Sequence, residues 1–330
     1  MTGRPVVGAS GEKPVEYALE SGADCTFVLK EYDRAPAFSG FFPGIAGPLG
    51  IPLWAFYVNR GQAVCSFGTR SKDNAIMEFQ HAAKAYALTA VYGFRTFLRC
   101  SAGGRTFVHE PFAPRAATGP SGCERLMRLS PHELGIEEYS RETGLRTEIT
   151  CHTLPGEQLG GLVRTVVIHN LSARELSVEI LDGMPALVPF GVGNEALKQM
   201  GKTVEAWTHV ENLETRVPFY RIRVLIDDSS EVREEKRGNF HLAMGGDPRR
   251  PELLPVVVDP VAVFGEDTTF RFPERYGDAL PASGQAQQYA NRTPCAFSVQ
   301  SRVLPPGGKC SFVTLTGAAP DVKVLNALLP

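Results

Sequence analysis

The segment WAFYVNRGQAVCSFGTRSKDNAIMEF, residues 54–79, contains two apolar runs, each followed by a polar turn. The first run ends at NRGQ, where Gly61 supplies the positive φ angle that a tight hairpin turn needs. A second turn over 69–75 precedes IMEF at 76–79, which begins a third strand. The segment therefore predicts a three-stranded antiparallel meander.

The side chains of the first strand fall on two faces. Trp54, Phe56 and Val58 share one face, and three large apolar residues in a row suit a sheet interior, so we expect all three in the structural core. The opposite face is more mixed and is open to a ligand or a neighbouring domain. The candidate binding residues there and in the turn are Tyr57, Asn59 and Arg60.

The rest of the chain carries the same pattern of strands and turns, with 33 glycines and 25 prolines spread throughout. VRTVVIHNLSARELSVEILDG (163–183) predicts a hairpin with one buried and one wet face. RIRVLIDD (221–228) alternates as a strand, and KCSFVTLTG (309–317) reads as a strand that ends at a glycine. We predict an all-β, mainly antiparallel fold, a large sandwich with a few short helices.

Helical signals are few. NEALKQMG (194–201) predicts a short helix with Asn194 as its N-cap and Gly201 at its end. HAAKAYALTAVYG (81–93) favours a helix on propensity, but its flanks are strand-like and argue against one. The charged segment 229–239 is expected to be an exposed loop.

Composition excludes several classes of partner. The 330 residues carry 34 basic and 36 acidic side chains and no basic tract, so neither nucleic acid nor an anionic membrane is an expected partner. No run reaches the roughly 18 apolar residues of a membrane span, and the first residues lack the apolar core of a secretion signal. The seven cysteines form no C-x-x-C pair, so we expect free thiols, no metal site and a cytoplasmic location.

Longer motifs add a resemblance. FSGFFPGIAGPLGIPLWAFYVNRGQAVCSFGTRSKDNAIMEF, followed by AAKAYALTAVYGFRTFL, resembles the N-terminal part of the inverting phosphorylases of glycoside hydrolase family 94, above all the 1,2-β-oligoglucan phosphorylases. The likeness continues, in order, through VEILDGMPALVPFGVG (178–193), EAWTHVENLETRVPFYRIRV (205–224), GNFHLA (238–243), VVVDPVAVFG (257–265) and NRTPCAF (291–297).

This resemblance implies a β-supersandwich of the galactose-mutarotase type over 36–320, after a lead-in over 1–35, with loop and strand in place of a helix at 81–93. It also implies that the chemistry belongs to a separate (α/α)6 barrel in cis or trans, where an aspartic acid assists attack by inorganic phosphate on a β-linked oligosaccharide. Residues 321–330 would begin the linker to that barrel. No catalytic residue and no cofactor can then be assigned to this chain, and a homodimer is an expected assembly.

Two other functions remain open. An aldose 1-epimerase would need a histidine–glutamate cluster in a deep pocket, and His169 and His209, on predicted strands, are the histidines to consider. A stand-alone carbohydrate-binding module would instead show exposed aromatic rings along a groove, whereas a domain of a phosphorylase would leave an apolar patch for the barrel. A hydrolase would need two paired carboxylates. Those near the resemblance motifs are Asp73, Glu78, Asp182, Glu205 and Asp259.

Arginines are the remaining candidates for sugar or phosphate contact, because a guanidinium group forks onto paired oxygens. Those on predicted strands or next to them are Arg95, Arg221 and Arg223, in addition to Arg60 in the first turn. A wet sheet face or an ion pair explains each of them equally well.

Overall fold

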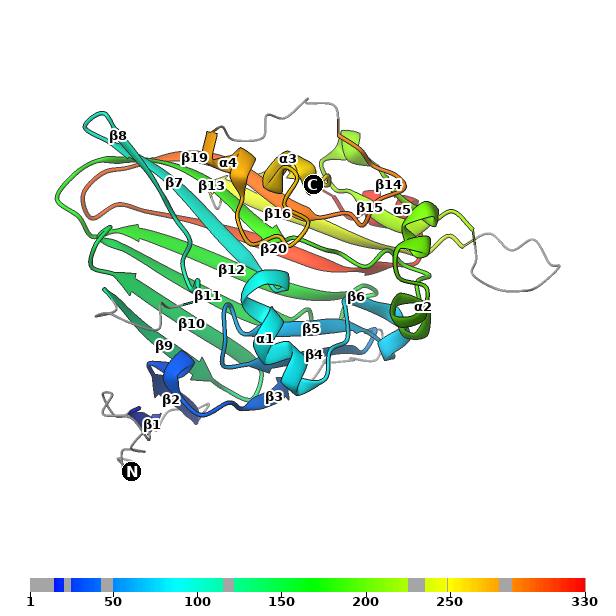
Figure 1. Ribbon diagram of the computed structural model, residues 1–330, viewed down its shortest axis with the longest axis horizontal. Coiled ribbons are helices and arrows are strands. Elements are labelled where there is room, and N and C mark those ends of the chain that lie inside the picture. The colour runs from blue at the N-terminus through cyan, green and yellow to red at the C-terminus, as the bar shows by residue number, and fades with distance from the viewer. Residues whose placement is uncertain are drawn as a thin grey trace.

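The fold is known from a computed structural model, which describes residues 15–20, 25–42, 50–114, 122–224, 235–247, 249–278 and 287–329. Its largest element is an antiparallel sheet of eleven strands (Figure 1). The order across it is β1 (Tyr17–Glu20), β2 (Thr26–Lys30), β9 (Cys123–Leu129), β10 (Glu133–Ser140), β11 (Leu145–Thr153), β12 (Gly160–Asn170), β20 (Lys309–Ala319), β16 (Gly238–Asp247), β15 (Phe219–Ile222) and β14 (Thr208–Glu211), with β17 (Arg250–Leu253) paired to β16.

Two smaller antiparallel sheets form the second layer. One contains β18 (Val256–Val257), β19 (Ala296–Leu304), β13 (Leu176–Met184), β7 (Arg95–Ala102) and β8 (Arg105–His109). The other contains β3 (Ser39–Phe42), β4 (Leu53–Val58), β5 (Val64–Thr69) and β6 (Ala75–Met77). One hydrophobic core joins all three sheets, through residues such as Val166, Ile180 and Phe67. This confirms the predicted all-β, mainly antiparallel sandwich.

Short helices connect the strands. They are α1 (Ala82–Tyr92), α2 (Asn194–Gln199), α3 (Val261–Phe264), α4 (Glu274–Asp278) and α5 (Val322–Asn326), with 3-10 turns η1 (Tyr32–Arg34), η2 (Lys72–Asn74), η3 (Gly201–Trp207) and η4 (Leu213–Thr215). None of the helices in the described ranges is long and apolar enough to cross a membrane. Helix α2 confirms the prediction at 194–201, but its N-cap is Gly193, and the Asn194 N–H is satisfied by the Asp73 carboxylate at 3.1 Å.

Helix α1 corrects the expectation of loop and strand at 81–93. The His81 ring accepts a hydrogen bond from the Lys84 N–H, and the helix ends at Gly93, whose N–H bonds the Thr89 carbonyl at 2.9 Å. Alanine has the highest helix propensity, and its small side chain lets α1 pack closely on β4 and β5 (Figure 1). At the closest approach, a Cβ added to Gly61 would lie 2.9 Å from the Ala90 Cα. Propensity was the better guide here.

The meander over 54–79 is confirmed, with β4, β5 and β6 as neighbours and Gly61 at φ +53°. Of the three β4 residues expected in the core, however, only Val58 is buried. Leu53 and Ala55 point into the core, and Tyr57 packs against it with a raised pKa caused by burial. The opposite face points outward, and α1 packs on part of it, where Val58 is buried beside Ala85 and Phe56 packs against the same cluster. Trp54 and Phe56 are therefore half-buried and do not belong to the core.

The predicted hairpin at 163–183 is wrong, although both strands exist. β12 lies in the large sheet between β11 and β20, whereas β13 lies between β7 and β19 in the other layer. The alternation was real, but the buried faces of the two strands face each other across the core. A period of two residues does not distinguish strands that pair from strands that stack.

Four other segments from the sequence analysis can be placed in the structure. The expected lead-in over 1–35 contains β1 and β2, which belong to the large sheet. The strand predicted at 221–228 ends at Ile222, Val224 is 58% exposed, and the rest of that segment lies outside the described residues. Within the expected linker, α5 packs back on the sandwich through buried Leu325. Of the loop expected at 229–239, only 235–239 is described, and β16 begins there at Gly238.

Candidate functional site

Most of the predicted site residues have structural roles. The Asn59 side chain is fully buried, where its amide donates to the carbonyls of Tyr32, Ala35 and Pro36 and its oxygen accepts the Phe38 N–H at 3.0 Å. It pins the chain before β3 to the β4–β5 turn. The neighbouring Arg60 donates to the Asn59 carbonyl at 2.7 Å.

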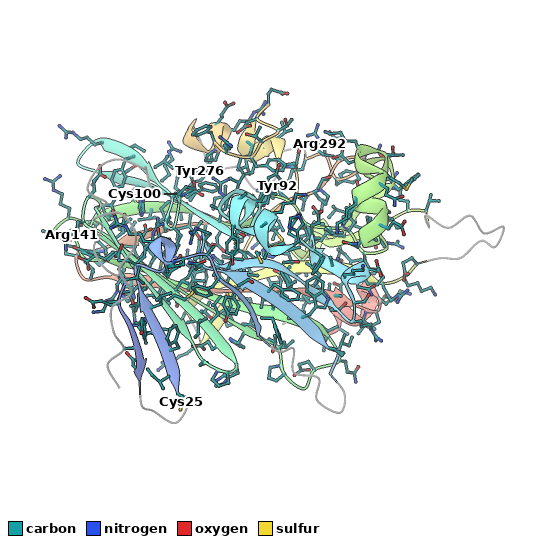
Figure 2. All side chains as sticks on the ribbon, turned by 60° about the horizontal axis from the view of Figure 1, so that its bottom comes forward. Cys25, Tyr92, Cys100, Arg141, Tyr276 and Arg292 are labelled. Atoms are coloured by element: carbon teal, nitrogen blue, oxygen red, sulfur yellow. The ribbon has the colours of Figure 1, made fainter. Side chains whose placement is uncertain are left out.

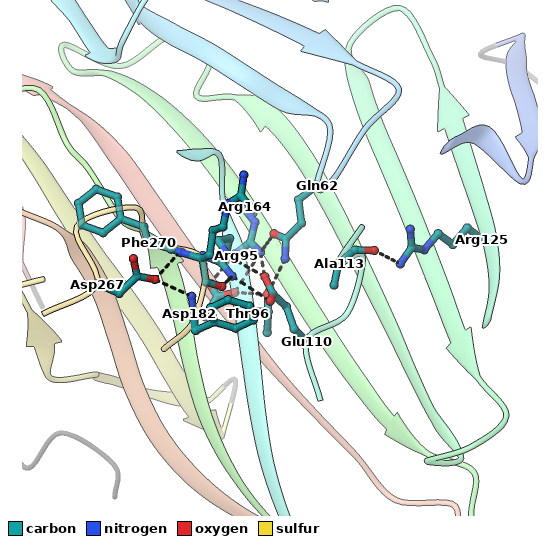
Figure 3. A network of polar contacts seen from close by, with 12 residues as sticks. Gln62, Arg95, Thr96, Glu110, Ala113, Arg125, Arg164, Asp182, Asp267 and Phe270 are labelled. Atoms are coloured by element: carbon teal, nitrogen blue, oxygen red, sulfur yellow. Dashed lines mark hydrogen bonds and ion pairs between the residues drawn. The ribbon is translucent and has the colours of Figure 1, made fainter. Parts of the chain in front are cut away.

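The arginines are engaged in ion pairs at separate places. Arg95 is buried and pairs with Glu110 at 2.6 Å (Figure 3). Its guanidinium group also lies over the Phe97 ring. Arg221 on β15 pairs with Glu211 on the adjacent strand β14 at 2.9 Å. Arg223 contacts the His209 ring at 3.0 Å. The structure therefore does not gather the predicted binding residues into one site.

A different set of residues lines a cavity of about 770 Å³ outside the core. Its walls are residues 77–80, one side of α1, the 186–189 segment, α2 with η3, α3 with the turn after it, and residues 288–293. Tyr92 on α1 and Arg292 both line it (Figure 2). Sequence reasoning missed this site because its walls come from six separate segments.

Two carboxylates that were considered from sequence line this cavity. Glu78 directly follows β6, and Glu205 lies on η3, where it accepts a hydrogen bond from the Thr293 hydroxyl at 2.8 Å. Asp259 stands behind the wall and holds Arg292 by an ion pair of 2.8 Å. The other two carboxylates are occupied elsewhere: Asp73 caps α2, and Asp182 is buried in the sandwich interior.

The remaining polar groups are arranged around an apolar floor. Leu88, Leu187, Val204 and Phe264 provide hydrophobic surface, while the amides of Gln80, Gln288 and Asn291 and the amines of Lys84 and Lys202 stand among them. A concave, largely apolar cavity with a few polar groups is typical of a small-molecule site.

Two reactive groups at the cavity have no catalytic character. Burial raises the pKa of the Cys65 thiol to about 12, so it is not a nucleophile near neutral pH. Hydrogen bonds, first from the Thr269 hydroxyl and then from the Phe272 N–H, lower the pKa of Asp267 to about 2. Its carboxylate braces the turn after α3 and is not an acid catalyst.

No histidine lies among the described residues that line the cavity. His169 is on the outer face of β12, 3.2 Å from Glu148, and burial lowers its pKa. His209 packs against the Tyr289 ring, and burial and Arg223 lower its pKa. The two histidines therefore do not form the histidine–glutamate pocket of an epimerase. The described residues also contain no group of three histidine, cysteine or acidic side chains placed to hold a metal ion, and all seven cysteines are free.

Comparison with known proteins adds little. No family model matches the sequence, and no curated protein matches it. Among solved structures, a polysaccharide lyase is similar at 12% identity over 85% of this chain, with a TM-score of 0.40. The match covers 33% of the lyase chain, so this chain spans about a third of its length. A likeness at this level says nothing about activity.

Proposed function

We propose that this chain is the N-terminal, carbohydrate-associated domain of a glycoside phosphorylase that acts on β-linked gluco-oligosaccharides, with a β-1,2 linkage as the expected substrate. The cavity holds part of the sugar chain. The chemistry takes place on an (α/α)6 barrel in cis or in trans, with inorganic phosphate as co-substrate.

One observation carries this proposal: the motifs that resemble the phosphorylases converge on the cavity. They are dispersed over more than 200 positions of the sequence, yet all of them except GNFHLA (238–243) contribute a lining residue. These residues are Glu78 from IMEF, Tyr92 from AAKAYALTAVYG, Pro189 from VEILDGMPALVPFGVG, Thr208 from EAWTHV, Phe264 from VVVDPVAVFG and Arg292 from NRTPCAF. A resemblance that reflected only sheet packing would centre on the core.

The chemistry of the cavity suits a carbohydrate. Sugars present apolar C–H faces together with hydroxyl groups that both donate and accept hydrogen bonds. The apolar residues of the cavity and the rings of Tyr92, Phe264 and Phe270 can pack against the C–H faces of a sugar, and the carboxylates and amides can hydrogen-bond its hydroxyl groups. An aldose 1-epimerase is not favoured, because the described lining lacks the histidines that its acid–base chemistry requires.

The test is calorimetric titration of the purified chain with sophorose and longer β-1,2-gluco-oligosaccharides. Leu88 is half-buried at the cavity wall, so Leu88→Trp should fill the site and abolish binding. Ala87 is the adjacent exposed residue of the same helix and does not line the cavity, so Ala87→Trp should bind like the parent. Absence of sugar binding by the parent, or equal binding by both variants, would refute the assignment of the cavity. A stand-alone carbohydrate-binding module is the second candidate. It would be favoured if the chain bound the sugar but no phosphorolysis followed when an (α/α)6 barrel was added.

A further inference from the structure

Four aromatic side chains form a continuous strip on the outward face of the four-stranded sheet. The ring centroids of Phe41 and Phe56 are 6.1 Å apart, those of Phe56 and Trp54 are 5.7 Å apart, and those of Trp54 and Phe79 are 6.0 Å apart. Phe41 is 70% exposed, and the other three are half-buried. We call Phe41, Trp54, Phe56 and Phe79 the aromatic strip.

Within the strip, contacts with the backbone orient the Trp54 indole. The Trp54 indole N–H donates to the Ser71 carbonyl at 3.0 Å. The indole lies against Gly68 on β5, where an added Cβ would be 2.7 Å from a ring carbon and would meet the backbone of Asn74 and Ala75 as well. An aromatic surface whose rotamers are already set loses little conformational entropy when a ligand stacks on it.

The strip borders the cavity. Glu78 and Gln80 line the cavity, and Phe79 between them belongs to the strip. On helix α2, Leu197 lines the cavity while the Lys198 ammonium lies 5.5 Å from the centre of the Phe79 ring. A ligand chain that leaves the cavity beside Phe79 would therefore contact Trp54 and Phe56 next and Phe41 last.

We propose that the aromatic strip binds the distal sugar residues of a β-linked gluco-oligosaccharide whose other end occupies the cavity; this rests on the proposed function. The electron-rich faces of aromatic rings attract the polarised C–H groups of a pyranose ring and tolerate any hydroxyl pattern at its edge. The strip therefore selects for chain length and adds little linkage specificity. An oligosaccharide is favoured over a second copy of this chain as the occupant, because the strip continues directly from the cavity.

The experiment compares sophorose with a long β-1,2-gluco-oligosaccharide by calorimetric titration. The parent should bind the longer chain more tightly. Phe41→Ala should weaken binding of the long chain by roughly three- to tenfold and leave sophorose unchanged, since one stacking contact has about that value. Trp54→Ala should do the same, and a thermal melt would report any loss of packing in that variant. Phe272→Ala is the matched control, because Phe272 is 69% exposed and lies outside both cavity and strip.

The possible results separate the two proposals. Equal affinity of the parent for short and long sugars, or an unchanged affinity of Phe41→Ala for the long chain, would overturn the role of the strip while the cavity assignment stands. Failure to bind either sugar would overturn both. If Phe41→Ala instead turned a dimer into a monomer in analytical ultracentrifugation, the strip would be an interface between copies, and this inference would be wrong.

Discussion

The sandwich should depend strongly on one buried ion pair between its layers. Arg164 on β12 is 1% exposed at its side chain, and Asp182 on β13 is 0% exposed. The guanidinium group donates to both carboxylate oxygens, at 2.5 and 3.0 Å, and also to the Gln62 side chain in the β4–β5 turn. The Thr96 hydroxyl on β7 donates to the same carboxylate at 2.6 Å (Figure 3). The network therefore joins all three sheets.

Asp182→Asn removes the negative charge with almost no change of volume and leaves a buried guanidinium group without its counter-ion. Breaking a buried pair in this way costs about 3–5 kcal/mol, because the remaining charge keeps its desolvation penalty and loses its partner. Natural domains have about 5–15 kcal/mol of stability in all, so the variant should be folded only marginally. Urea unfolding of the parent and variant, followed by tryptophan fluorescence and circular dichroism, measures the difference.

The control makes the same chemical change at the surface. Glu124 pairs with Arg141, and the two side chains are 57% and 69% exposed. Glu124→Gln should leave the unfolding midpoint unchanged, because an exposed pair is screened by water and salt. If Asp182→Asn unfolded within about 1 kcal/mol of the parent, water would already solvate the Arg164 charge, and the account of a dry interlayer network would be refuted.

Three further outcomes are expected. Burial, and then Arg164, lower the pKa of His241 to about 3. Between pH 6.5 and about 3 mainly the unfolded chain therefore binds a proton at this residue, and the stability of the fold decreases as the pH drops through this range. His241→Gln should reduce this dependence of stability on pH, measured by urea melts, by up to about 1.4 kcal/mol per pH unit. Gly61→Ala should reduce the free energy of unfolding by about 1–2 kcal/mol because its backbone is left-handed, and by more because the new Cβ would contact Ala90. Gly103 is also left-handed but has open space around it, so Gly103→Ala should lose only the backbone contribution. Equal losses of stability in thermal melts would argue against the close approach of α1 to Gly61. The chain alone should release no glucose 1-phosphate from sophorose and phosphate, because the resemblance assigns the acid to the barrel, and enzymatic detection of that product would contradict it.

Local chemistry in the sequence predicted the elements well. Gly61 correctly predicted the β4–β5 turn, and the residues of high helix propensity at 194–199 correctly predicted α2. Pairing was harder, because β12 and β13 alternate as a hairpin would, yet Arg164 and Asp182 show that their faces meet across the core. The orientation of β4 was missed for a related reason. Large apolar residues were taken to indicate the buried face of β4, and Ala55 is small. It is nevertheless buried, because larger residues from the other strands fill the core next to it.

The site was harder still to predict, because nothing in a single segment marks it. Glu78 and Glu205 were visible as carboxylates, but their common cavity depends on how α1 and η3 are placed. The useful signal was the set of resemblance motifs taken together, since all of them except GNFHLA (238–243) contribute part of the wall. The arginines misled for the opposite reason. A guanidinium group on a strand suits a ligand and an ion pair equally well, and Arg95 and Arg221 both make ion pairs.

The location of the cavity has a consequence for how this fold can tolerate change. Large side chains and the Arg164 network occupy the space between the layers. The cavity is built instead from connections that follow strands: α1 after β6, the 186–189 segment after β13, and α3 after β18. Binding residues on such connections can vary without disturbing the core that holds them. Variants such as Leu88→Trp should therefore remove sugar binding and leave the unfolding transition near that of the parent. Asp182→Asn should instead lower the stability and leave sugar binding unchanged as long as the chain is folded.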